Sequence, residues 1–267
     1  HRLQNQPYGW SQWMRHQHRD DFWKHGSVCE DYSAIKAAVL SIGGWHDGYR
    51  NTISHLVENL TAPVKGIVGP WNHKYPHFAG PKPAIGFLQE ARRWWDHWLK
   101  GEDTGVDKDP AYRAYVMDAL PPERWFEERP GRWIAEPQWP SPDISRTVLH
   151  FMGDGKLGQQ SAKIGKSVQS PHDCGTQTGE YFPFAYDNEL PDEQTPDDDR
   201  SLCFDGDLLK ESIDIVGAAK ISLLVRSNRK QGQIAVRLCD VQPDGRSAHI
   251  SFGCLNLTHA KSHENPE

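Results

Sequence analysis

The chain has 267 residues, of which 37% are hydrophobic and 25% are charged, and its net charge is −6 at pH 7. This composition predicts a folded protein of one large or two ordinary domains and excludes wholesale disorder. The negative charge, with no basic stripe, argues against a nucleic-acid partner. No apolar run reaches the roughly 20 residues that a membrane-spanning helix needs.

The five cysteines are scattered, and no two of them form a Cys-x-x-Cys pair. Such a set predicts reduced thiols in a reducing compartment, and therefore a cytoplasmic protein, with neither a disulfide framework nor a zinc site. The sequence opens at His1 with neither a signal peptide nor an initiator methionine. We therefore expect this chain to be part of a longer one.

The first 118 residues carry helical and strand patterns in turn. Residues 1–25 are polar, aromatic and rich in histidine, and their spacing predicts a helix that ends near Gly26. Further on, strands are expected at 37–45 and 64–71, and helices at 50–61 and 84–101. Strand and helix in alternation are typical of a parallel sheet covered by helices. The last of these helices should stop at Gly101 and pack three tryptophans against the sheet, namely Trp94, Trp95 and Trp98.

The pattern changes after about residue 120, where prolines cluster and the helical period is lost. Short runs of β type follow, each bounded by Gly, Asp, Asn or Pro, at residues 146–152, 219–228, 232–242 and 247–257. Many short strands at this spacing predict a β-sandwich or jelly roll. The acidic stretch 187–201 is expected to be a solvated loop, with a cation site as the alternative.

Two polar residues follow the two predicted strands of the sheet. Asp47 comes after the first strand, in a turn rich in glycine and aromatic residues, and His73 comes after the second. Functional residues gather at the carboxyl ends of parallel strands. An acid followed by a histidine one βα unit later is also the order found in α/β-hydrolases, where the histidine takes a proton from a serine and the carboxylate orients the histidine. Either residue alone is more often a turn former or a packed side chain.

Several stretches of the chain resemble the cocaine-esterase-like (CocE/NonD) hydrolases, which are related to the X-Pro dipeptidyl-peptidases. They include the motifs Gly-Trp-x-Asp-Gly at 44–48 and Gly-Pro-Trp-x-His at 69–73, and residues 87–105, 149–158, 204–217 and 237–247. The resemblance implies that Asp47 is the acid of a catalytic triad and His73 its base. It also implies that Tyr49 lines the substrate pocket, with Trp45 as a second substrate contact.

The fold implied by the resemblance is an α/β plus all-β arrangement, the C-terminal half of an α/β-hydrolase sheet followed by a jelly-roll β-sandwich of galactose-binding-like type. The expected domains are a remnant of a helical cap at 1–25, the C-terminal part of the hydrolase domain at 26–135, and a truncated jelly roll at 136–267. No Gly-x-Ser-x-Gly elbow occurs. The nucleophilic serine and the oxyanion hole are therefore expected upstream, and the chain is expected to associate with its missing N-terminal part or with itself.

The predicted function is that of a serine hydrolase, without cofactor or metal, acting on a small ester or amide or on a short peptide. This chain alone is expected to be inactive. The alternative is a non-catalytic fragment that serves as a β-sandwich binding module. A metal hydrolase is disfavoured, because Pro76 interrupts any helix joining His73 to His77 and no glutamate lies between them. His46 faces away from Asp47 along the chain and is expected to pack or to line the pocket.

Overall fold

The computed structural model describes residues 2–6, 8–160, 163–184 and 189–267. The chain divides into two compact units, each built from separate stretches of sequence. The first contains the N-terminal residues up to Ile35, together with Ala219–Leu238 and Ser251–Glu267, and the second contains Lys36–Ala218 and Cys239–Ile250. Both residues of the predicted acid–histidine pair belong to the second unit.

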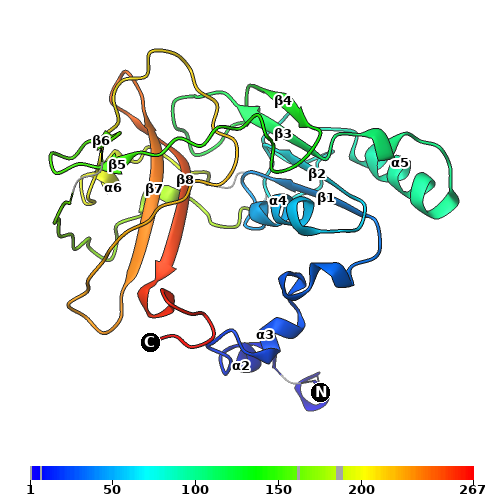
Figure 1. The fold of residues 1–267 in the computed structure, drawn as a ribbon, viewed down its shortest axis with the longest axis horizontal. Helices are drawn as coiled ribbons and strands as arrows, with labels where there is room; N and C mark the ends of the chain where they lie inside the picture. The colour runs from blue at the N-terminus through cyan, green and yellow to red at the C-terminus, as the bar shows by residue number, and fades with distance from the viewer. Residues whose placement is uncertain (1, 7, 161–162, 185–188) are drawn as a thin grey trace. The chain divides into compact units, whose positions relative to one another are not determined.

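The second unit is organised around a four-stranded sheet in the order β1-β2-β3-β4. Its strands are β1 (Val39–Gly44), β2 (Val64–Gly69), β3 (Tyr112–Met117) and β4 (Gly131–Glu136). The first three run parallel, and β4 pairs antiparallel with β3. Helix α4 (Arg50–Asn59) links β1 to β2 and packs on both strands (Figure 1), so the predicted order of strand, helix and strand is confirmed.

The two parallel strands β1 and β2 pair without offset, from Val39 opposite Val64 to Gly44 opposite Gly69. Both strands therefore end at the same level, and the turns that follow them lie at one edge of the sheet. Carboxyl ends of neighbouring parallel strands form the usual position of functional side chains in such sheets. In this protein the segments that carry Asp47 and His73 begin at this edge.

A buried apolar cluster joins α4 to the sheet. Its members are Ile53, Val57, Val68, Tyr112 and Ala114. At Gly66, on β2, an added Cβ would lie 2.7 Å from a methyl group of Val57, so the helix packs directly on the strand backbone. Burial of each large side chain in such a cluster contributes about 1.5–3 kcal/mol to stability.

Helix α5 (Phe87–Lys100) ends as predicted at Gly101, which takes up the left-handed conformation with φ of 76°. Trp94 is buried as expected, but Trp95 and Trp98 are 52% and 38% exposed. The prediction that all three tryptophans pack against the sheet was therefore wrong. A surface helix buries one stripe of side chains, and adjacent residues such as Trp94 and Trp95 point about 100° apart around its axis.

The N-terminal residues form short helices and not the single predicted helix. These are α1 (Arg2–Asn5), α2 (Gly9–Trp13) and α3 (Asp21–His25). Asp20 explains the last break, because its carboxylate accepts a hydrogen bond of 3.1 Å from the Phe22 amide and so begins α3 as an N-cap. The predicted end near Gly26 is confirmed. Positions 1 and 7 lie outside the described residues.

Two small sheets follow in the β-rich half of the chain. Strand β5 (His150–Phe151) pairs with β6 (Leu157–Gly158), and β7 (Gln233–Val241) pairs with β8 (Ser247–Asn256). The strands predicted at 232–242 and 247–257 are thus confirmed, whereas the run 146–152 is a strand only at His150 and Phe151.

The run 219–228 was predicted to be a strand and is not one. Its apolar side chains are exposed, Leu223 to 46% and Leu224 completely. An alternating pattern makes a strand only where a neighbouring strand pairs with it, and among the described residues none does so here. A complete jelly roll therefore stays a prediction.

The acidic stretch 187–201 is only partly a solvated loop. It contains the short helix α6 (Thr195–Asp198), and within that helix Asp197 is completely buried. Its two carboxylate oxygens accept hydrogen bonds from the amides of Gly175 and Gln177. Composition alone predicted a loop, because acidic residues with few apolar neighbours are usually solvated. Positions 187 and 188 lie outside the described residues.

Single turns of 3-10 helix complete the described secondary structure, at Val28–Glu30, Tyr32–Ala34, Val106–Lys108, Thr176–Thr178 and Leu257–His259. In the described part of the chain, no helix has both the length and the apolar character that crossing a bilayer would require.

Candidate active site

The turn after β1 is held against the segment after β2 by backbone hydrogen bonds. The Trp45 amide donates to the Gly69 carbonyl at 2.9 Å, and the His46 amide donates to the Trp71 carbonyl at 3.0 Å. Asp47 then closes a tight turn, because its amide donates to the Gly44 carbonyl at 3.1 Å. The glycine at 44 is required by this close approach, since an added Cβ would overlap the Trp71 carbonyl oxygen.

Substituting Gly44→Ala is expected to destabilise the protein by about 1–3 kcal/mol, the usual cost of forcing an extra methyl group into packed surroundings. The Trp71 backbone would have to move, and Trp71 itself is 1% exposed. The measurement is the urea midpoint of unfolding. Gly165→Ala is the matched control, because nothing lies within 4 Å of a Cβ placed there. Equal midpoints for the two variants would contradict the close approach.

Asp47 and His73 are in direct contact. The Asp47 Oδ2 atom lies 2.8 Å from the His73 Nδ1 atom, and the Asp47 residue is only 7% exposed. The second carboxylate oxygen, Oδ1, accepts a hydrogen bond of 2.8 Å from the Tyr49 amide. The Arg50 guanidinium donates to the Asp47 backbone carbonyl at 3.2 Å. Both oxygens are therefore engaged, and the carboxylate is fixed in one orientation toward the imidazole.

Aromatic rings surround the His73 imidazole. Its ring centroid lies 4.4 Å from that of Phe182, 5.5 Å from that of Phe184 and 5.8 Å from that of Tyr49. The His73 amide donates to the Pro183 carbonyl at 3.0 Å. With the ring proton on Nδ1 facing Asp47, the Nε2 atom is the acceptor, and the side chain is 36% exposed. Such an imidazole can receive a proton from a group outside the described residues.

The two predicted substrate contacts take different positions. Tyr49 is 62% exposed, and its ring stands edge-on to that of His73. Trp45 packs against the apolar cluster of the sheet, and its indole N–H donates to the Tyr115 carbonyl at 2.7 Å. The structure thus brings Tyr49 to the acid–histidine pair and turns the polar end of Trp45 toward β3. A role in substrate binding stays a prediction for both residues.

His46 is a half-buried neighbour of the pair. Its Nε2 atom is enclosed and has no hydrogen-bond partner among the described residues. Burial is the main cause that lowers the pKa of His46 to about 3. Nearby positive charges add to the effect, those of Arg129, Arg50 and His249. The imidazole is consequently neutral at physiological pH, as expected of a packed histidine.

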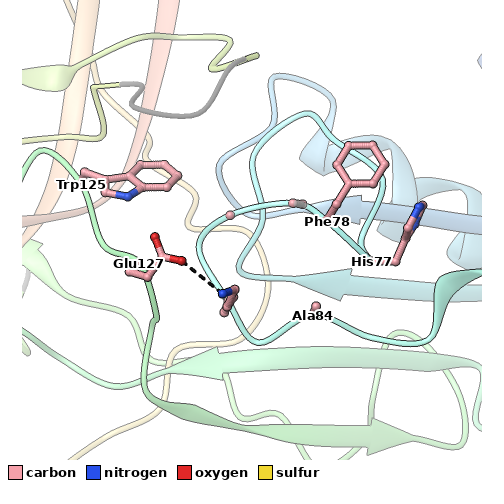
Figure 2. Close-up of a pocket in the computed structure, with 8 residues that line it drawn as sticks. His77, Phe78, Ala84, Trp125 and Glu127 are labelled. Atoms are coloured by element: carbon pink, nitrogen blue, oxygen red, sulfur yellow. Dashed lines mark ion pairs between the residues drawn. The ribbon is translucent and has the colours of Figure 1, made fainter.

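Among the described residues, neither the candidate metal ligands His73 and His77 nor the small cavity near His77 shows several polar groups pointing to one centre. The His77 ring stacks on Phe87, with centroids 5.7 Å apart. No group of three or more His, Cys, Asp or Glu side chains in the described ranges is arranged to hold a metal ion. A cavity of about 240 Å³ lies beside His77. Figure 2 shows Trp125 on one side of it and Phe78 on the other, and its one ion pair, Lys82 with Glu127 at 3.2 Å, is well exposed.

Sequence reasoning missed Phe182 and Phe184. Both belong to the β-rich half, far from Asp47 and His73 in the chain, and no local pattern marks an aromatic residue that will contact a distant histidine. The glycine at 48 is a partial indication of this contact, because an added Cβ there would lie 2.6 Å from Phe182. It shows that a side chain must approach, but not which one.

Comparison with known proteins identifies relatives for both halves of the chain. Residues 104–267 match the family described as the X-Pro dipeptidyl-peptidase C-terminal non-catalytic domain. Residues 1–75 match the X-Pro dipeptidyl-peptidase family S15. Cocaine esterase of Rhodococcus sp. (strain MB1 Bresler) is 24% identical over 97% of this chain and 48% of its own length.

Two further matches have lower coverage. A candidate Xaa-Pro dipeptidyl-peptidase of Rhodopirellula baltica is 24% identical over 82% of this chain and 32% of its own length. A solved CocE/NonD family hydrolase from Staphylococcus aureus has a TM-score of 0.40 and 16% identity, covering 55% of this chain and 25% of the other. The chain thus spans about half, or less, of the length of the curated relatives it matches.

The first family match extends over more than half of the chain, and the second covers the turn that carries Asp47 and reaches His73. The chain therefore belongs to the family described as the X-Pro dipeptidyl-peptidase C-terminal non-catalytic domain.

Proposed function

We propose that this chain supplies the acid and the base of a serine hydrolase that cleaves esters or amides. The observation that supports the proposal is the contact of 2.8 Å between Asp47 Oδ2 and His73 Nδ1 at neighbouring strand ends. A carboxylate in that position fixes the imidazole tautomer and stabilises the imidazolium that forms during reaction. The names of the relatives, an esterase and a candidate dipeptidyl-peptidase, agree with this class of reaction.

The proposed reaction proceeds through an acyl-enzyme. A serine oxygen forms a bond to the carbonyl carbon of the substrate, and its proton passes to Nε2 of His73. The bond to the leaving alcohol or amine then breaks, and His73 returns the proton to that group. Water repeats the sequence on the acyl-enzyme, which releases the acid and restores the serine.

The nucleophilic serine is proposed to lie outside these 267 residues. Among the described residues, no hydroxyl group is hydrogen-bonded to His73. Strand β1 stands at the end of the sheet order. A further strand could therefore pair with its open side and present the serine beside His73. The jelly roll at 136–267, the hydrolase part at 26–135 and the cap remnant at 1–25 belong to the same proposal.

The proposed substrate is a small ester or amide, or a short peptide. Tyr49 is the first candidate for a substrate contact, because its exposed ring adjoins the ring of His73. Trp45 is the second, through the part of its ring that the core does not cover. Neither contact needs a cofactor or a metal ion, because the chemistry of the proposed triad is acid–base and nucleophilic.

The test is labelling with a fluorophosphonate, which reacts with activated serines. A tag is added to this chain at its gene in the source cells. The tagged protein is purified together with every polypeptide bound to it. We call this sample the native preparation. We expect ester hydrolysis and one labelled serine, found by denaturing intact-mass spectrometry on a polypeptide other than the 30.4 kDa chain or longer than it. Hydrolysis without a labelled serine would contradict the proposal.

The alternative is a non-catalytic binding module. It is favoured by one observation, that the family matched by residues 104–267 is described as non-catalytic. Under this alternative the native preparation contains the folded chain but shows neither hydrolysis nor a labelled serine. The same experiment therefore separates the two functions.

A further inference from the structure

A segment of the β-rich half reaches the proposed catalytic histidine. Phe182 is the centre of the contact, because its ring touches both catalytic turns. It lies 4.4 Å from the His73 ring, between centroids, and a Cβ at Gly48 would lie 2.6 Å from it. Its neighbour Pro183 accepts the hydrogen bond of the His73 amide at 3.0 Å. One short stretch therefore contacts the side chain and the backbone of His73 together.

The orientation of His73 depends on these contacts. The torsion that turns an imidazole about its Cβ–Cγ bond is soft, so a single hydrogen bond to Asp47 leaves the ring free to rock. Phe184 limits this motion, because its ring lies nearly parallel to that of His73, at an interplanar angle of 28°. An aromatic face also attracts a cation, so these rings favour the imidazolium that forms during reaction.

The base of the segment is closed by backbone geometry. The Glu180 amide donates to the Glu189 carbonyl at 2.8 Å, and the Leu190 amide donates to the Arg124 carbonyl at 2.7 Å. Gly179 enters the segment with φ of 68° and ψ of −159°, a conformation that is essentially restricted to glycine. The two ends of this segment, residues 179–180 and 189–190, are therefore held next to each other.

Asp197 anchors the residues immediately before this base. It is fully buried, and its carboxylate accepts hydrogen bonds from the Gly175 amide at 2.8 Å, the Gln177 amide at 2.9 Å and the Arg200 guanidinium at 2.8 Å. The Gln194 side chain donates to the Gln177 carbonyl at 2.7 Å. A buried carboxylate with this many donors is held firmly, and so is the turn that supplies them.

We propose that Phe182 is a positioning residue for His73, and that Asp197 is the anchor that holds the segment carrying Phe182 in place. This role rests on the proposed function, because it concerns the orientation of the same histidine. The segment acts through the histidine and takes no part in bond making. Its loss should lower the rate of the chemical step and leave substrate binding nearly unchanged.

The first experiment is a proton NMR spectrum of the 267-residue chain itself. A hydrogen bond between His Nδ1–H and a carboxylate gives a strongly downfield exchangeable proton, assigned here by its loss in His73→Gln and in Asp47→Ala. Phe182→Ala is expected to remove or broaden this signal, and Phe182→Tyr to retain it. Phe78→Ala is the matched control, because Phe78 is also exposed and near the second turn, and its ring contacts Tyr75 and His77.

Kinetics of the native preparation provide the second readout. Phe182→Ala is expected to lower kcat by about 10–100-fold with little change in KM, the range seen when a reacting group is misplaced by about 1 Å. Asp197→Asn retains the shape of the side chain but loses an acceptor oxygen, so it should have the same effect without touching His73. Circular dichroism checks that each variant is folded. If Asp197→Asn does not fold, the result for Phe182→Ala alone tests the proposal.

The outcomes separate the positioning role from the proposed function. An unchanged proton signal and an unchanged kcat in Phe182→Ala would overturn the positioning role and leave the acid–histidine pair intact. Absence of the signal from the unsubstituted chain would overturn both, because the pair itself would not be formed. A rise in KM with unchanged kcat would also overturn the positioning role, since it would show that Phe182 binds substrate.

Discussion

Replacing His73 with alanine is expected to lower kcat of the native preparation by about 10⁴-fold or more, the loss found when a triad histidine is removed. The reason is geometric: Nδ1 of His73 is bound to a nearly buried carboxylate at 2.8 Å, which leaves Nε2 to take the proton of the proposed serine. Asp47→Asn should give a loss of similar size, because an amide at that position favours the wrong tautomer. The measurement is the initial rate of ester hydrolysis at saturating substrate.

His77→Ala is the matched control for this experiment. His77 lies four residues further along, is exposed and stacks on Phe87, so its removal changes the histidine count without touching Asp47. We expect an unchanged kcat. Full activity of His73→Ala would remove the basis of the proposed function, and equal losses in both variants would show damage to the fold of this loop.

Acid is expected to destabilise the protein through His46. The pKa of His46 is about 3 in the folded state and 6.5 without burial, so the unfolded chain binds the proton more strongly at intermediate pH. The stability that this residue contributes is therefore fully present above pH 6.5 and is lost as the pH falls toward 3. Between the two pKa values, the free energy of unfolding changes by about 1.4 kcal/mol per pH unit. We reduce this figure to about 1 kcal/mol per pH unit, because the residue is only half-buried.

The variant His46→Gln measures this effect, because glutamine has no proton to gain. Urea unfolding at several values between pH 7 and pH 4.5 should show a flatter dependence for His46→Gln than for the unsubstituted chain, with a difference of roughly 2 kcal/mol over this range. The exposed His55 serves as the control, since His55→Gln should retain the original slope. Parallel slopes for the chain and His46→Gln would show that the buried imidazole does not control acid unfolding.

The acid–histidine pair could be predicted because its signals are local. Each residue follows an apolar strand, and the glycines at 44 and 48 mark a tight turn within a few positions of Asp47. Parallel strands that end level bring such turns together. Asp20 was predicted to lie within the N-terminal helix, because the spacing of the aromatic and histidine residues around it is helical, but its side chain instead caps the start of α3.

The rest of the site could not be read from the sequence, because it depends on contacts between distant segments. Phe182 looks like any aromatic residue in a loop until it is seen against His73. Asp197 lies in a run of acidic residues whose composition indicates solvation, yet it is completely buried and accepts hydrogen bonds from two backbone amides. Residues 219–228 show the converse, a strand pattern without a partner strand in the described structure.

The contact between Phe182 and His73 has a consequence for recombination among relatives. Consider a chimera that joins the sheet-bearing half of one protein to the β-rich half of another. Its acid and histidine would come from one parent, and the aromatic segment that contacts that histidine would come from the other. Under the proposed function, such hybrids would lose turnover although they contain every residue of the proposed triad. Restoring the segment around Phe182 from the first parent should repair them, so the two halves of this chain are best exchanged as a single module.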